Sequence, residues 1–148
     1  MELKQLLTAI KYRAEQVPDV DITDLVYDSR KAVPGCAFVC LRGANADGHK
    51  YAKMAAEKGA AVIIAEEPVE APVPVILTDN TRLALAYLSA EFFGHPAEQM
   101  HVIGITGTKG KTTSSFLVKS ILEEAGRKTG LIGTVCSMIG EEVVPASL

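Results

Sequence analysis

Residues 101–113, HVIGITGTKGKTT, combine an apolar run with a glycine-rich turn that ends in Gly-Lys-Thr. The pattern predicts a strand from His101 that leads into a phosphate-binding loop and then into a helix. Glycine lets the backbone bend so that successive N–H groups point inward and form a nest for a polyanion. The alternative is a glycine-rich turn without a ligand. The strand predicted before the loop and the helix predicted after it favour the phosphate loop.

The loop departs from the usual spacing GxxxxGK[ST], because Ile105 occupies the position of the first glycine. Backbone N–H groups and the positive end of the helix dipole are expected to bind the phosphates of a nucleoside triphosphate. Lys111 is expected to reach the terminal phosphates as the catalytic residue, and the Thr112 hydroxyl is expected to bind Mg²⁺. The predicted nucleotide-binding set is Gly107, Thr108, Lys109, Gly110, Lys111, Thr112 and Thr113.

The composition is typical of a globular protein and gives no sign of nucleic-acid binding. Of the 148 residues, 48% are hydrophobic and 22% are charged, and the net charge is -3, so we expect a packed core and no basic face. The chain lacks an apolar run of about 18 residues, and acidic and basic residues are spread over the whole of residues 1–15. We therefore expect a cytoplasmic protein without membrane insertion. Cys36 and Cys40 are expected to be reduced core residues.

Periodicity and turn residues predict alternating strands and helices in the first part of the chain. The expected elements are an amphipathic helix at 2–16, strands at 25–27, 37–41, 61–65 and 75–77, and helices at 49–58 and 80–93. In the last helix, the residues expected to face the core are Leu83, Ala86, Tyr87 and Ala90. This alternation predicts a small α/β domain over residues 1–98.

Residues 99–148 form a second predicted unit. After the loop we expect a helix at 111–125, a strand at 129–132, and either a hairpin or an excursion off the sheet edge around Gly140. A phosphate-loop domain needs several parallel strands that are covered on both faces. Residues 99–148 are too few for such a sheet, so we expect the chain to be the N-terminal part of a longer enzyme.

Five segments of the chain together resemble the Mur ligases. They are DSR at 28–30, PGCAFV at 34–39, RGANADGHKYA at 42–52, KGAAVIIAE at 58–66 and ITGTKGKTT at 105–113. The resemblance covers the whole chain, and it implies a UDP-sugar-binding domain at 1–98 followed by the beginning of the ATP-binding central domain at 99–148. Lys109 departs from the asparagine that is commoner in the family loop, and it leaves the glycine framework intact.

The resemblance also implies a substrate site in the first domain. The Ser29 hydroxyl would hydrogen-bond the uridine nucleotide, and the other residues lining that site would be Tyr27, Ala44, Asn45 and Ala46. From the residues alone, there is an alternative to each ligand role: a turn cap for Ser29 and a residue of a left-handed bend for Asn45. Arg30, Arg42 and Lys50 are near enough in sequence to surround a diphosphate. From the sequence, whether they bind it or are solvated surface residues stays open. His49 is interpreted as a helix-start or packing residue.

The implied reaction is ATP-dependent amide-bond formation in peptidoglycan synthesis. The carboxylate of UDP-N-acetylmuramoyl-L-Ala-D-Glu attacks the γ-phosphorus of ATP, and the amine of a diamino acid then displaces phosphate from the acyl phosphate. In the family, further magnesium ligands, a carboxylated lysine and the amino-acid site lie beyond the position of Leu148, so we expect no turnover from this chain alone.

Three alternatives stay open from the sequence. The first is the branch of the family that adds D-alanyl-D-alanine. The second is a non-catalytic module that binds a uridine nucleotide. The third is another phosphate-loop protein, such as a GTPase or a kinase-like phosphotransferase, although no NKxD guanine-reading segment occurs.

Overall fold

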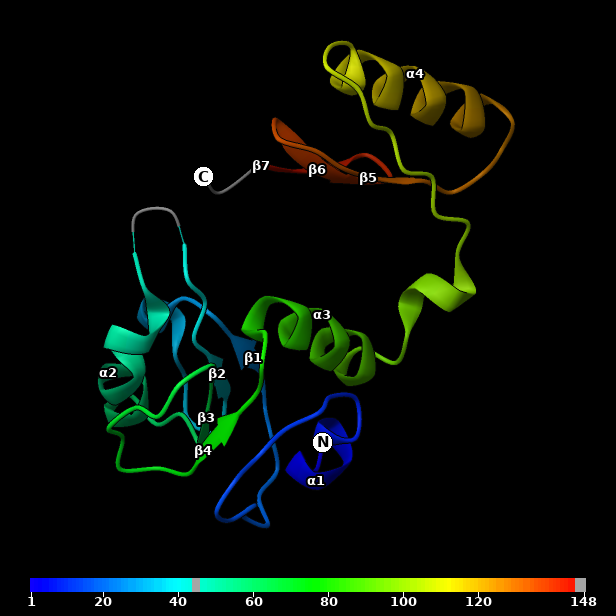
Figure 1. Cartoon of the computed structure of the whole chain (residues 1–148). Coiled ribbons are helices and arrows are strands. Elements are labelled where there is room, and N and C mark those ends of the chain that lie inside the picture. Colours follow the sequence, from blue (N-terminus) through cyan, green and yellow to red (C-terminus); the bar gives the residue numbers. More distant parts are fainter. Residues whose placement is uncertain (44–45, 146–148) are drawn as a thin grey trace. The chain divides into compact units, whose positions relative to one another are not determined.

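The computed structural model describes residues 1–43 and 46–145, which separate into two compact units (Figure 1). The units are Met1–His101 and Val102–Leu148. The expected functional division, with a UDP-sugar-binding domain at 1–98 and an ATP-binding domain from 99, stays a prediction. No helix within the described ranges is long and apolar enough to cross a membrane.

The first unit is built on a parallel sheet of four strands in the order β1-β2-β3-β4. Its strands are β1 (Leu25–Val26), β2 (Ala37–Val39), β3 (Val62–Ala65) and β4 (Val75–Leu77). Ile63 at the centre pairs with Phe38 on one side and Val75 on the other. All four strands were predicted, and the predicted α/β class is confirmed. The parallel pairing is a finding of the structure.

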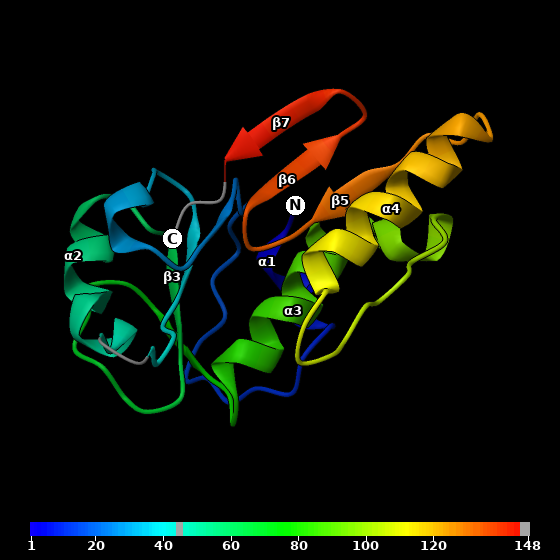
Figure 2. The same ribbon diagram turned by 90° about the horizontal axis from the view of Figure 1, so that it is seen from above.

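Helices cover both faces of this sheet, as parallel sheets require (Figures 1 and 2). Alternate strand residues point to opposite faces, so Val39 and Ile64 pack against α1 (Leu3–Leu7) and α3 (Thr81–Phe92). Phe38 and Ile63 belong to the other core, which includes the alanines of α2 (Ala52–Glu57). Short 3₁₀ turns complete the unit: η1 (Ser29–Lys31), η2 (Gly48–Tyr51) and η3 (Pro96–Gln99).

The N-terminal helix is much shorter than the predicted 2–16, since α1 ends at Leu7. Further on, the chain runs beside β4 and pairs with it at Arg13. The Arg13 N–H donates to the Leu77 carbonyl and the Leu77 N–H donates to the Arg13 carbonyl, both at 2.8 Å. An edge strand leaves backbone groups unpaired, and this bridge satisfies them. The extended backbone at Arg13 is incompatible with the predicted helix.

The sequence also predicted the wrong buried face for α3. Leu83 and Tyr87 are 53% and 52% exposed, whereas Ala84 and Leu88 are buried in the core. Both stripes of this helix are apolar, so periodicity could not choose between them. The choice depends on the start of the helix, where the Thr81 N–H and hydroxyl both donate to the Glu66 carboxylate after β3.

The second unit contains α4 (Lys111–Glu124) and three antiparallel strands in the order β5-β6-β7. The strands are β5 (Gly130–Ile132), β6 (Cys136–Ile139) and β7 (Glu142–Pro145), so the segment around Gly140 is a hairpin. The strand predicted from His101 is not formed, and Val102 and Ile103 are 72% and 60% exposed. A strand needs a hydrogen-bonded neighbour, and among the described residues β5 pairs only with β6.

Gly48, which opens η2, lies where two backbone segments approach closely. A Cβ atom at this position would lie 2.6 Å from the Leu41 nitrogen and 2.9 Å from the Leu41 oxygen. We expect Gly48→Ala to destabilise the first unit by about 1–3 kcal/mol, because the backbone must move apart. Urea unfolding measures this change.

The control for this substitution is Gly133→Ala, whose added Cβ would meet nothing closer than 3.5 Å. Alanine is a better helix former than glycine, so an unhindered Gly48→Ala would be neutral or stabilising. A Gly48→Ala protein that unfolds at or above the wild-type urea midpoint contradicts the close approach.

Candidate functional site

The predicted substrate residues follow β1 and β2, which are neighbours in the parallel sheet. Tyr27 and Ser29 come directly after β1, and Ala46 lies in the loop after β2. Ala44 and Asn45 fall outside the described residues. Since parallel strands end at the same edge, both loops leave the sheet on its carboxyl side. Open α/β sheets bind ligands at this edge.

Ser29 begins η1 and is only 7% exposed, whereas the neighbouring Tyr27 is 61% exposed. The turn is capped by Asp28, whose Oδ1 accepts from the Arg30 N–H at 3.0 Å. The Ser29 carbonyl accepts from Lys58 Nζ at 3.0 Å. Its hydroxyl has no hydrogen-bond partner among residues 1–43 and 46–145. The contacts of the turn therefore hold the serine through its backbone.

The guanidinium of Arg30 is engaged within its own turn. Its Nε lies 2.9 Å from Asp28 Oδ1 and its Nη2 lies 2.7 Å from Asp28 Oδ2. These side-chain bonds, together with the bond from the Arg30 N–H, lower the pKa of Asp28 to about 2. This bidentate pair occupies the Nε and Nη2 donors of Arg30 and offsets part of its charge.

Arg42, the second base considered for a diphosphate, is also paired. Its guanidinium lies 2.9 Å from Glu67, 3.8 Å from Glu66 and 3.9 Å from Asp47. Lys50, the third base, is exposed and forms no ion pair with any residue in the described ranges.

His49 is a structural residue that ties η2 to the end of β3. It is 7% exposed, its Nδ1 lies 2.7 Å from Asp47 Oδ1, and its Nε2 accepts from the Glu66 N–H at 3.0 Å. In this arrangement Nε2 is the acceptor and Nδ1 is the ring nitrogen that faces the Asp47 carboxylate. Asp47, His49 and Glu67 place possible metal ligands within 4.8 Å of one another, yet Arg42 already pairs with both carboxylates.

The predicted phosphate loop is exposed at all of its positions, residues 107–113. Gly107 and Gly110 have φ values of 154° and 78°, and Gly110 is the N-cap of α4 without a side-chain cap. The Lys111 ammonium reaches back across the loop and donates to the Gly107 carbonyl at 2.7 Å. The N–H groups at the start of this 14-residue helix are therefore available to an anion.

Two surface hollows of the first unit lie apart from these residues. One, of about 340 Å³, is lined by residues of α3 and η3, and the other, of about 540 Å³, is lined by residues of 13–16 and 68–77. Neither hollow is lined by a predicted site residue. The candidate sites lie instead in the loops after β1 and β2 and in the loop before α4.

Of the two residues that shape the Ser29 turn, the sequence analysis missed Lys58. Asp28 belongs to the DSR segment singled out at 28–30 and had a local signal, because an aspartate two residues before an N–H donor is typical of a turn cap. Lys58 had none, since it lies 29 residues from Ser29 along the chain. Only the packing of α2 beside η1 brings its ammonium to the turn.

The comparisons with known proteins identify the family. Residues 21–93 match the family model described as Mur ligase family, catalytic domain, and this match ends before the phosphate loop. The chain is 49% identical over 150 residues to the UDP-N-acetylmuramoyl-L-alanyl-D-glutamate--2,6-diaminopimelate ligase of Bacillus licheniformis, covering 99% of this chain and 30% of that protein. The ligase of the same name from Listeria monocytogenes is 43% identical over 145 residues, covering 97% and 30%.

Solved structures give the same class. A crystal structure of MurF from Acinetobacter baumannii has a TM-score of 0.68 at 35% identity, covering 82% of this chain and 27% of that one. A UDP-N-acetylmuramoyl-L-alanyl-D-glutamate--2,6-diaminopimelate ligase structure has a TM-score of 0.73 at 20% identity, covering 98% and 30%, and shows the shared fold. The chain therefore contains a Mur ligase family domain and belongs to that family. It spans about 30% of the length of the curated relatives it matches.

The ion pair of Asp28 predicts a pH dependence of stability. Its pKa in the folded chain, about 2, lies below the value in an unfolded chain, so its contribution is complete above about pH 4 and is lost as the pH falls through 2. We expect the difference in unfolding free energy between wild type and Asp28→Asn to be constant above about pH 4 and to shrink towards pH 2. Urea unfolding from pH 2 to pH 6 measures it.

The matched variant is Arg30→Met, which removes the partner of the carboxylate and is expected to flatten the same part of the pH profile. A difference between wild type and Asp28→Asn that stays unchanged down to pH 2 contradicts the pairing.

Proposed function

We propose that this chain supplies the uridine-nucleotide and triphosphate sites of an ATP-dependent amide-bond ligase of peptidoglycan synthesis, acting in the cytoplasm. The observation that carries the proposal is the glycine loop at the start of α4, closed by the bond from Lys111 to the Gly107 carbonyl. It occurs in a chain that is 41–49% identical to ligases whose names specify UDP-N-acetylmuramoyl-L-alanyl-D-glutamate as substrate.

The residues of the phosphate loop fit Mg²⁺ and ATP. The Lys111 ammonium already spans the loop, and the uncapped N–H groups of α4 face outward with no side chain to satisfy them. Thr112, at the second position of the helix, would offer its hydroxyl to the metal. When bound, Mg²⁺ screens the negative charge that gathers around the transferred phosphoryl group. Lys111 and the backbone amides would bind and orient the triphosphate for attack by the substrate carboxylate.

The uridine end of the substrate is proposed to lie at the carboxyl edge of β1 and β2. The half-exposed ring of Tyr27 and the free hydroxyl of Ser29 offer an apolar face and a polar group to a base. Ala46 belongs to the neighbouring loop, whose ends are joined by the bond from the Gly43 N–H to the Ala46 carbonyl at 2.8 Å. Ala44 and Asn45 are proposed to complete this side of the site.

The added amino acid is proposed to be 2,6-diaminopimelate, because three curated relatives at 49%, 46% and 41% identity carry it in their names. The second candidate is a ligase that adds D-alanyl-D-alanine. A solved UDP-N-acetylmuramoylalanyl-D-glutamyl-2,6-diaminopimelate--D-alanyl-D-alanyl ligase from Acinetobacter baumannii is 35% identical with a TM-score of 0.65, which favours this candidate less.

Binding of the uridine nucleotide tests the first half of the proposal. We expect Ser29→Ala to weaken the binding of UDP-N-acetylmuramoyl-L-Ala-D-Glu by about tenfold, the loss of one neutral hydrogen bond. Isothermal titration calorimetry on the chain measures the affinity. The control is Ser89→Ala on α3, which is expected to bind as the wild type does. Equal affinity of Ser29→Ala and wild type contradicts the role of the serine.

Binding of the triphosphate tests the second half. We expect Lys111→Met to weaken the binding of Mg·ATP by about 3 kcal/mol, roughly a hundredfold, because the preorganised cation is lost. Lys128→Met, at an exposed lysine beyond the C-terminal end of α4, is the control. A chain that binds the uridine ligand but shows no affinity for Mg·ATP, with or without Lys111, would be a uridine-nucleotide module.

A further inference from the structure

The turn that carries Ser29 cannot satisfy its own carbonyl groups. η1 has three residues, and its internal backbone bond runs from the Lys31 N–H to the Asp28 carbonyl at 2.8 Å. The next residue, Ala32, is already extended, so the ladder does not continue. The carbonyls of Ser29 and Arg30 are therefore the orphan acceptors found at the end of any helical turn.

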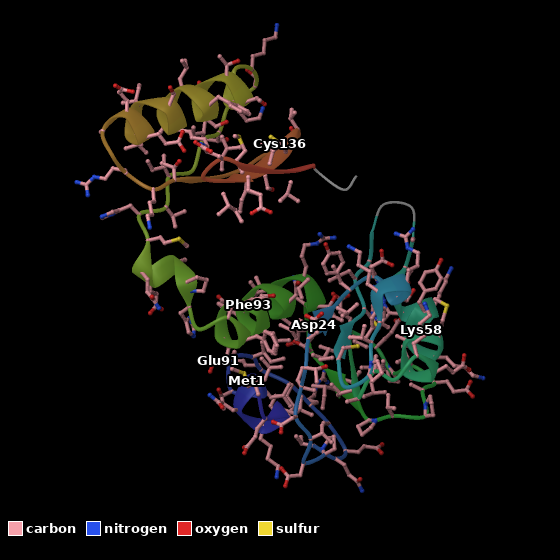
Figure 3. All side chains as sticks on the ribbon, turned by 180° about the vertical axis from the view of Figure 1, so that it is seen from behind. Met1, Asp24, Lys58, Glu91, Phe93 and Cys136 are labelled. Carbon is pink, nitrogen blue, oxygen red and sulfur yellow. The ribbon has the colours of Figure 1, made fainter. Side chains whose placement is uncertain are left out.

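Lys58 supplies the donors that this turn lacks. Its ammonium donates to the Ser29 carbonyl at 3.0 Å and lies 3.4 Å from the Arg30 carbonyl. Figure 3 shows Lys58 where α2 and the turn after β1 lie together. An ammonium carries three donors, so one group holds both carbonyls.

The position of Lys58 is fixed by the core. It is the C-cap residue of α2, whose Ala52 and Ala55 are buried against the sheet. The carbonyl of the following residue, Gly59, accepts from the Gly35 N–H at 2.8 Å. A Cβ at Gly59 would lie 3.0 Å from the Pro34 Cα atom, so the two backbones are in close contact. The lysine therefore extends from a rigid base to the turn.

We propose that Lys58 is a positioning residue of the uridine site. It acts by holding the backbone of Ser29. This inference rests on the proposed function of Ser29. Asp28 fixes the turn at its start through the Arg30 N–H, and Lys58 fixes it at its end through the two carbonyls. Held at both ends, η1 fixes the direction of the Ser29 Cα–Cβ bond that carries the hydroxyl, so binding does not have to order the backbone of the turn.

The ammonium of Lys58 donates to two backbone carbonyls, which leave its charge intact, so holding the turn and binding a diphosphate directly are two distinct roles for it. A lysine that bound a diphosphate directly would act independently of Ser29. A lysine that positions Ser29 acts only while the serine hydroxyl is present, and this difference can be measured.

Calorimetry with UDP-N-acetylmuramoyl-L-Ala-D-Glu on the whole chain tests the inference. We expect Lys58→Met, which keeps the apolar stem and removes the donors, to weaken binding by about fivefold. Lys58→Arg restores donors and is expected to recover most of the affinity. The matched control is Lys53→Met, because Lys53 is an exposed lysine of the same helix without a hydrogen bond to the described residues. It is expected to bind as the wild type does.

A double-mutant cycle with Ser29→Ala separates positioning from direct contact. In the Ser29→Ala background, Lys58→Met is expected to cost less than about twofold further, because the group it positions is gone. A full fivefold loss in that background overturns the inference. If Lys58→Met does not fold, as thermal unfolding would show, Lys58→Gln replaces it with the same expectations.

The outcomes for Lys58 and for the proposed function are distinct. Absence of binding by the wild-type chain contradicts the uridine site itself. Weakened binding by Ser29→Ala together with wild-type affinity in Lys58→Met leaves the site standing and refutes the role of Lys58. A loss in Lys58→Met that Lys58→Arg does not recover also refutes it.

Discussion

Parallel pairing of β1 to β4 is the constraint on which the first unit depends. A strand in such a sheet is buried on both faces, so alternate residues of β2 and β3 enter two different cores, one with Val39 and Ile64 and the other with Phe38 and Ile63. Each core needs its own helices, which α1 and α3 supply on one face and α2 on the other. The loops that follow the parallel strands leave the sheet at its carboxyl edge, so their polar side chains lie along that edge.

The carboxyl edge is ordered by bonds between its own loops. His49 and Glu66 connect the loop after β2 to the end of β3, and Glu66 also receives both donors of Thr81 at the start of α3. Arg42 adds its charge to the same group of carboxylates. These groups make their hydrogen bonds and ion pairs within the scaffold.

The two candidate sites differ in the sequence separation of the residues that hold them in shape. In the phosphate loop, Lys111 bonds to Gly107, four residues earlier, and glycine φ values make the bend. The contacts of this loop lie within a few residues of one another, and the strand expected before it is not formed among the described residues. The Ser29 turn, in contrast, needs Lys58 from another element.

The sequence by itself determined the features that depend on neighbours along the chain: the four strands, the helices α2, α3 and α4, the glycine loop with Lys111, and the family. Tertiary structure decided the rest. The bridge between Arg13 and Leu77 ended the predicted first helix, because an edge strand needs partners for its backbone. The bonds of Thr81 to Glu66 chose which apolar stripe of α3 is buried, and the packing of α2 brought Lys58 to Ser29. Each of these depends on groups far apart in sequence, whose meeting no local pattern encodes.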